Sequence, residues 1–66
     1  MRLTVNGEVR EAPDRATLAQ FLASLGIEAG KVAVERNLEI APRSRWAAIG
    51  LEEGDRLEIV HFVGGG

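Results

Sequence analysis

The fold is decided by the opening of the chain, residues 2–11, which read Arg2-Leu3-Thr4-Val5-Asn6-Gly7-Glu8-Val9-Arg10-Glu11. Polar and apolar residues alternate on both sides of Asn6-Gly7, as they do in strands that bury one face. Asn-Gly is favoured in a type I′ turn, because both of its residues adopt positive φ at low cost. The stretch therefore predicts a β-hairpin with strands at residues 2–5 and 8–11.

One helix is predicted after this hairpin. The sequence Thr17-Leu18-Ala19-Gln20 has the pattern of a capping box, in which the first and last side chains each bond the other residue's backbone amide. Gly26 is placed to end the helix, with Ile27 folding back on Leu22. We expect a helix over residues 18–25 that covers one face of a sheet. Its apolar stripe has helical spacing and consists of Leu18, Phe21, Leu22 and Leu25.

The middle of the chain predicts further parts of the same sheet. Residues 31–36 alternate like a third strand, residues 38–40 form a short apolar element, and Pro42 breaks the pattern. An irregular stretch around Trp46 is expected to close the bottom of the core, with the indole ring buried and a short strand nearby. The other apolar residues of this stretch are Ile49 and Leu51.

The order of these elements indicates an α+β fold. Residues 52–55, Glu-Glu-Gly-Asp, predict a turn with solvated acids, and residues 56–63 predict the last and longest strand. A mixed sheet with one main helix on one face follows from the order. This pattern suits a β-grasp roll, in which the first and last strands are parallel central neighbours. We therefore expect a β-grasp domain over residues 1–63 and a flexible glycine tail over residues 64–66.

The last strand is predicted to have two different apolar faces. If Leu57 and Ile59 meet the helix, Val60 and Phe62 point to the opposite face of the sheet. That face has no helix to cover it, so its apolar side chains suggest a docking surface for a partner. An alternative is that Val60 and Phe62 pack under the loop around Trp46.

The composition excludes several classes of protein. The chain has 66 residues, a formal net charge of −2 and no cysteine. Without a basic block, binding to nucleic acid is disfavoured. No apolar run is long enough for a membrane span or a signal peptide, so we expect a cytoplasmic protein. No self-complementary seam is visible in the sequence, so we expect a monomer when the protein is alone. Without cysteine there are no disulfides, thiolate metal sites or thiol nucleophiles.

Catalysis by the chain alone is not expected, and neither is a bound metal. The one histidine, His61, has no second histidine or cysteine with which to form a metal cluster. It is expected at a solvated or core-edge position, because a general base would need an orienting partner that the sequence does not identify. Serine occurs only as Ser24 and Ser44, neither of which lies in a nucleophile-elbow pattern.

The end of the chain carries the most specific functional signal. Gly64-Gly65-Gly66 follows the strand-like Phe62-Val63 without a linker, and glycine's lack of a Cβ lets such a tail enter a narrow cleft. A carboxylate becomes electrophilic only after activation, for instance as an acyl-adenylate made by a partner that uses ATP. An amine then gives conjugation, and a sulfur donor gives a thiocarboxylate. A frayed terminus without function is the alternative.

These features together resemble a known family. The β-grasp pattern, Val34-Glu35-Arg36-Asn37 after the helix and the ending at residues 58–66 closely resemble the ThiS family, the sulfur-carrier proteins of thiamine biosynthesis. The resemblance covers essentially the whole chain. It implies that a ThiF-like adenylyltransferase uses ATP and Mg to adenylate the terminal carboxylate, while the chain itself binds no cofactor. Sulfur from a cysteine desulfurase system then replaces AMP, and a ThiG-like thiazole synthase takes the sulfur.

The resemblance also assigns roles to residues near the end of the chain. It implies that Gly66 carries the acyl group and that Gly65 is the second residue of the diglycine. Val60 and Phe62 match the partner-facing positions of the family's last strand. Gly64 is a departure, since many relatives have another small residue there.

Other functions share the same ending and remain open at this point. The small subunit of molybdopterin synthase and the ubiquitin-like modifiers are similar in topology and also end in diglycine. Lys31 is the only lysine, so chains of self-conjugates have few internal acceptors, which favours a carrier over a modifier. A purely structural β-grasp subunit would need neither the glycines nor a free carboxylate.

Overall fold

The structure is a computed structural model and describes residues 1–63 of the chain. The predicted glycine tail, residues 64–66, lies outside the described residues. The elements in chain order are β1 (Arg2–Val5), β2 (Glu8–Glu11), α1 (Leu18–Ser24), η1 (Ala29–Lys31), β3 (Val32–Arg36), β4 (Glu39–Ile40), η2 (Arg43–Ala48) and β5 (Arg56–His61).

The strands form one mixed sheet of five strands in the order β2-β1-β5-β3-β4. The opening hairpin is confirmed: β1 and β2 are antiparallel, and Asn6 and Gly7 both have positive φ, 49° and 83°, as a type I′ turn requires. β1 and β5 are parallel neighbours, as predicted. β5 therefore occupies the middle of the sheet.

The start of α1 was correctly predicted, and its end lies one residue before the predicted one. Thr17 and Gln20 form the capping box in both directions. At the other end, the Ile27 amide donates to the Leu22 carbonyl at 3.1 Å, and Gly26 has a φ of 73°, which together make a Schellman motif. Leu25 is the C-cap rather than a helical residue, because its ψ of 0° already departs from helical geometry.

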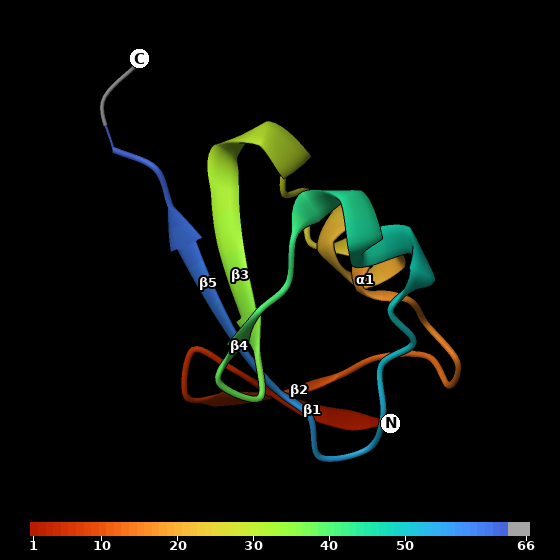
Figure 1. Cartoon of the computed structure of the whole chain (residues 1–66). Helices are drawn as coiled ribbons and strands as arrows, with labels where there is room; N and C mark the ends of the chain where they lie inside the picture. The colour runs from red at the N-terminus through yellow and green to blue at the C-terminus, as the bar shows by residue number, and fades with distance from the viewer. Residues whose placement is uncertain (64–66) are drawn as a thin grey trace.

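The core lies between the sheet and the layer formed by α1 and η2. Figure 1 shows both helical segments on the same side of the sheet, with β5 and β3 side by side. Leu18, Phe21 and Leu22 are buried, while Leu25 is only partly buried beside the core. Trp46 is buried as predicted. The strands contribute their inward-facing residues to this core, namely Leu3, Val5, Val32, Val34, Leu57 and Ile59.

The prediction of a short strand near Trp46 is wrong. The segment is the 3₁₀ helix η2, which begins after Pro42, and the Arg45 amide donates to the Pro42 carbonyl at 2.8 Å. The indole Nε1 donates to the Ala41 carbonyl at 2.7 Å. The buried indole N–H is thus satisfied by a carbonyl only five residues away, at the point where the chain leaves β4 and before η2 begins.

The sheet strands β3 and β5 are each shorter than predicted. Lys31 belongs to η1, so β3 begins at Val32 instead. β5 ends at His61, opposite Val32. The Phe62 amide still donates to the Lys31 carbonyl at 2.9 Å. Beyond this bond, η1 turns the segment before β3 away from β5, so within residues 1–63 Val63 has no strand partner on that side.

Candidate functional site

The predicted docking residues lie on the face of the sheet opposite α1. Leu57 and Ile59 are buried under the helical layer, whereas Val60 and Phe62 are 61% and 62% exposed. This confirms the predicted face assignment, and it contradicts the alternative in which both residues pack under the loop around Trp46. We call the face of the sheet opposite α1 the open face. Figure 1 shows that neither α1 nor η2 lies over it.

β5 provides a rigid base for the end of the chain. It pairs over residues 57–61 with β3 and at its start with β1. The start of β5 is therefore held by backbone hydrogen bonds along both edges, and the rest of the strand is held along the edge that faces β3. Figure 1 shows that β5 runs out to the opposite end of the molecule from the N-terminus. The last described residues are therefore presented at one end of the sheet, next to the open face.

Asn6 has a second role that the sequence analysis missed. Its side-chain Nδ2 donates to the Ile59 carbonyl at 3.1 Å, and its Oδ1 accepts from the Ile59 amide at 2.7 Å. The side chain thus continues the β1–β5 pairing beyond Val5 and Leu57. A turn-favouring Asn-Gly pair gave no sign of this contact, because Ile59 lies 53 residues away in the sequence.

In the acidic turn before β5, Glu52 and Glu53 are exposed as predicted, but Asp55 is not. Asp55 is only 6% exposed. Its Oδ2 accepts from Arg36 Nε at 3.0 Å and from the Glu52 amide at 2.8 Å, and its Oδ1 accepts from Asn37 Nδ2 at 3.0 Å. The Asn37 side chain also accepts from the Arg56 amide at 2.9 Å. This cluster ties the start of β5 to the β3–β4 turn and fixes where the strand begins.

The same cluster sets the acidity of Asp55. Burial alone raises the pKa of its carboxyl, but the hydrogen bonds from Asn37, the Glu52 amide and Arg36, with the Arg36 charge, lower the pKa by more, and the net pKa lies below 3.8. A carboxyl whose pKa falls on folding stabilises the fold above its unfolded pKa. That contribution is lost as the pH falls from about 3.8 through the lower folded value.

Replacing Asp55 with asparagine is expected to destabilise the protein by about 2 kcal/mol near neutral pH, because one oxygen that accepts from a buried donor becomes an N–H group. The difference between Asp55→Asn and the unchanged protein should begin to shrink below about pH 3.8, where the Asp55 carboxyl of the unfolded chain becomes protonated, and should shrink further as the pH falls through the lower pKa of the folded protein. Urea unfolding at several pH values measures both effects. A difference that stays constant down to the lowest pH would contradict the assigned role of the charge.

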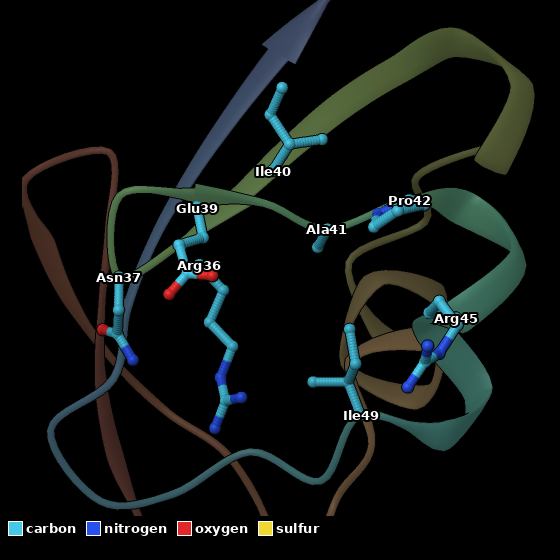
Figure 2. Close-up of a pocket in the computed structure, with 8 residues that line it drawn as sticks. All are labelled: Arg36, Asn37, Glu39, Ile40, Ala41, Pro42, Arg45 and Ile49. Carbon is cyan, nitrogen blue, oxygen red and sulfur yellow. The ribbon is translucent and has the colours of Figure 1, made fainter.

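An open pocket of about 360 Å³ lies on the other side of the β3–β4 hairpin, between it and η2. Figure 2 shows the Arg36 side chain pointing away from Ile40 and toward the loop that precedes β5. Arg36 is already engaged there by Asp55 and by the Gly50 carbonyl. The pocket contains none of the predicted site residues, and of the two arginines that line it, Arg36 is already paired with Asp55. It therefore gives no basis for a ligand site.

The remaining predicted features lie where expected or outside the described part of the chain. His61 is exposed and borders the core edge near Leu25 and Ile27. Within residues 1–63, no group of histidine, aspartate and glutamate side chains is arranged to hold a metal. In the same residues, no helix is long and apolar enough to cross a membrane. Gly64, Gly65 and Gly66, which carry the predicted chemistry, are not among the described residues.

Known proteins resemble this chain both in sequence and in fold. It is 45% identical, over 97% of its length, to the sulfur carrier protein ThiS of Bacillus subtilis and covers 98% of that protein. The crystal structure of the thiamine biosynthesis protein ThiS from Geobacter metallireducens has a TM-score of 0.86, with 33% identity and full coverage of both chains. This likeness agrees with the β-grasp roll predicted from the order of elements.

The whole chain is also 50% identical to part of a thiazole synthase of Paramagnetospirillum magneticum. It spans only 20% of the length of that relative, so the enzyme contains a much larger region with no counterpart here. The model of the ThiS family matches residues 3–66. With this match and the near full-length similarity to the Bacillus carrier, the chain belongs to the ThiS family.

Proposed function

We propose that this chain is a sulfur carrier that supplies sulfur for thiazole formation in thiamine biosynthesis. The observation that carries the proposal is the similarity to the Bacillus subtilis sulfur carrier over nearly the full length of both chains. In this role the chain is a protein co-substrate, and partner enzymes perform the catalysis. Its contribution is a folded body that partners bind and a terminal carboxylate on which the sulfur travels.

The proposed chemistry takes place at the carboxylate of Gly66. In the active site of a ThiF-like adenylyltransferase, this carboxylate attacks the α-phosphorus of ATP, with Mg bound to the nucleotide, and pyrophosphate leaves. A persulfide sulfur of a cysteine desulfurase system then attacks the acyl carbon, and AMP leaves as the C–S bond forms. A thiol of the sulfur donor cleaves the remaining S–S bond, which releases the thiocarboxylate and leaves a disulfide on the donor. Gly64 and Gly65 let the arm pass through narrow active-site clefts, because neither residue has a side chain.

The open face supports the docking step of this proposal. Val60 and Phe62 are large, exposed and adjacent to the end of β5, and exposed apolar patches of this kind are typical of interaction sites. A partner that binds there has the terminal residues within reach of its active site. The similarity to part of a thiazole synthase favours thiazole synthase as the acceptor of the sulfur.

Transfer of sulfur from the thiocarboxylate form tests this assignment. When that form is mixed with thiazole synthase and its deoxyxylulose phosphate-derived intermediate, the sulfur should pass to the thiazole precursor, which mass spectrometry of the product detects. A modifier would instead leave a Gly65-Gly66 remnant on lysines of other proteins. Sulfur that moves only to a pterin precursor, or adducts that dominate over transfer, would contradict the thiamine assignment.

A further inference from the structure

Two carboxylates lie opposite each other on the open face. Glu35 of β3 and Glu58 of β5 are directly paired in the antiparallel register, and both are exposed. Directly opposed side chains leave the sheet on the same side with Cβ atoms about 5 Å apart, and like charges in such a pair are destabilising. Within residues 1–63, neither carboxylate is part of an ion pair.

Apolar side chains surround this acidic pair. One step toward the end of β5 on the same face, Ala33 lies opposite Val60, and Phe62 follows by the alternation of the strand. On the other side of Glu35, β4 places Ile40 directly opposite it, with 78% of its surface exposed. Figure 2 shows Ile40 pointing away from Arg36, toward the open face.

Arg56 is a cation on the same strand and the same face as Glu58, but among the described residues it is not paired with either carboxylate. Arg56 lies two residues before Glu58 on the same strand, and therefore on the same face. It forms no ion pair with Glu58 or Glu35 in the described part of the chain. Within residues 1–63, no ion pair compensates either carboxylate, so their mutual repulsion is expected to cost stability in the free protein.

This arrangement indicates the chemistry of the partner. Alone, the exposed apolar side chains of Val60, Phe62 and Ile40 could pack against any apolar partner surface. The two carboxylates among them favour a partner surface that carries a cation. An arginine fits best, because its planar guanidinium can donate to both carboxylates at once. Complementary charge of this kind selects the correct partner and its orientation.

We propose that the open face binds an arginine or lysine side chain of thiazole synthase between Glu35 and Glu58, with the apolar residues packed around it. This rests on the proposed function, in which thiazole synthase is the acceptor. Thiazole synthase is the occupant because relatives of that name contain a segment 50% and 44% identical to this whole chain. In those relatives the carrier unit and the rest of the enzyme are covalently joined, so the two are constant neighbours.

The variant Glu58→Lys separates binding from folding. It replaces a like-charge pair by an opposite-charge pair with Glu35, so the unfolding temperature should stay the same or rise. Binding to thiazole synthase should weaken about tenfold or more, because the new lysine repels the partner's cation. The double variant Glu35→Gln/Glu58→Gln should weaken binding less and reduce its dependence on salt concentration.

The matched control is Glu8→Lys. Glu8 is exposed on the edge strand β2 and pairs with Val5, whose side chain points into the core, so it lies on the other side of the sheet from Glu58. The variant Glu8→Lys makes the same change in net charge as Glu58→Lys. Its affinity for thiazole synthase should stay within about twofold of that of the unchanged protein, as expected for a charge outside the interface. Titration calorimetry with purified thiazole synthase, at low and high salt, measures the unchanged protein, these three variants and Phe62→Asp, and the same proteins are titrated with the adenylyltransferase.

Four other outcomes of the binding and unfolding measurements would each contradict a different part of the inference. If Glu58→Lys binds as tightly as Glu8→Lys while Phe62→Asp binds weakly, the cation contact is wrong and docking through the open face stands. If only the adenylyltransferase loses affinity for Glu58→Lys, the face is correct and the occupant is wrong. A lower unfolding temperature for Glu58→Lys would contradict the repulsion in the free protein. Absence of any binding by the unchanged chain would overturn both this inference and the proposed acceptor.

Discussion

Replacing Leu57 with aspartate is expected to unfold the protein, whereas replacing Phe62 with aspartate should leave it folded and weaken partner binding. Leu57 is 0% exposed in the middle strand of the sheet. A carboxylate there has neither water nor a cation, and its burial costs several kcal/mol. A domain of this size is stable by only about 5 kcal/mol. The cost at Leu57 is therefore comparable to the whole free energy of unfolding.

Phe62 differs because 62% of its surface is already exposed. Aspartate at this position remains hydrated, so the unfolding temperature should change little. At a partner interface the loss of an apolar anchor commonly costs about 2 kcal/mol or more, which is roughly a thirtyfold loss of affinity. Circular dichroism melts measure the first effect, and titration with the adenylyltransferase and thiazole synthase measures the second. If Phe62→Asp melts the fold while Leu57→Asp is tolerated, the assignment of the two faces is reversed.

Removal of Gly65 and Gly66 is expected to abolish adenylation without loss of stability. Under the proposed chemistry, the carboxylate of Gly66 accepts the adenylyl group of ATP, and a shorter arm cannot deliver the new carboxylate to the same point in the partner's active site. Release of pyrophosphate in the presence of ATP and the adenylyltransferase measures the reaction. The core residues lie within residues 3–59, so the melting temperature should be unchanged.

The same truncated protein also separates docking from chemistry. It keeps Val60, Phe62 and the rest of the open face, so it should bind the adenylyltransferase at close to full affinity. Loss of binding together with loss of reaction would show that the glycines contribute to docking. Continued adenylation of the truncated protein, or a label that maps to a side chain, would refute the assignment to Gly66.

The sequence predicted those parts of the fold that depend on local patterns. Asn6-Gly7 specifies a turn through the φ preferences of two adjacent residues, and Thr17 and Gln20 cap a helix within a single turn. The alternation in β5 was enough to assign Val60 and Phe62 to the open face. Each of these signals depends on residues a few positions apart, so no knowledge of tertiary contacts was needed.

The features that the sequence did not reveal depend on distant contacts. Asp55 looked like a solvated turn acid because Arg36 and Asn37, its partners, lie 19 and 18 residues away. The acidic pair Glu35 and Glu58 becomes visible only once the register between β3 and β5 is known. Leu38 has a φ of 71° after Asn37 at 51°. A leucine in the sequence does not predict a turn with positive φ, because that conformation is costly for a residue with a bulky side chain.

The most direct test of the sulfur-carrier function is the intact mass of the protein isolated from cells grown with ample sulfur. Under reducing conditions, a fraction of the molecules should have one oxygen replaced by sulfur, and fragmentation should place the sulfur on Gly66. The fraction should disappear when the adenylyltransferase is absent from the cells. A mass that never shows this replacement, or a sulfur atom located anywhere other than Gly66, would contradict the proposed function.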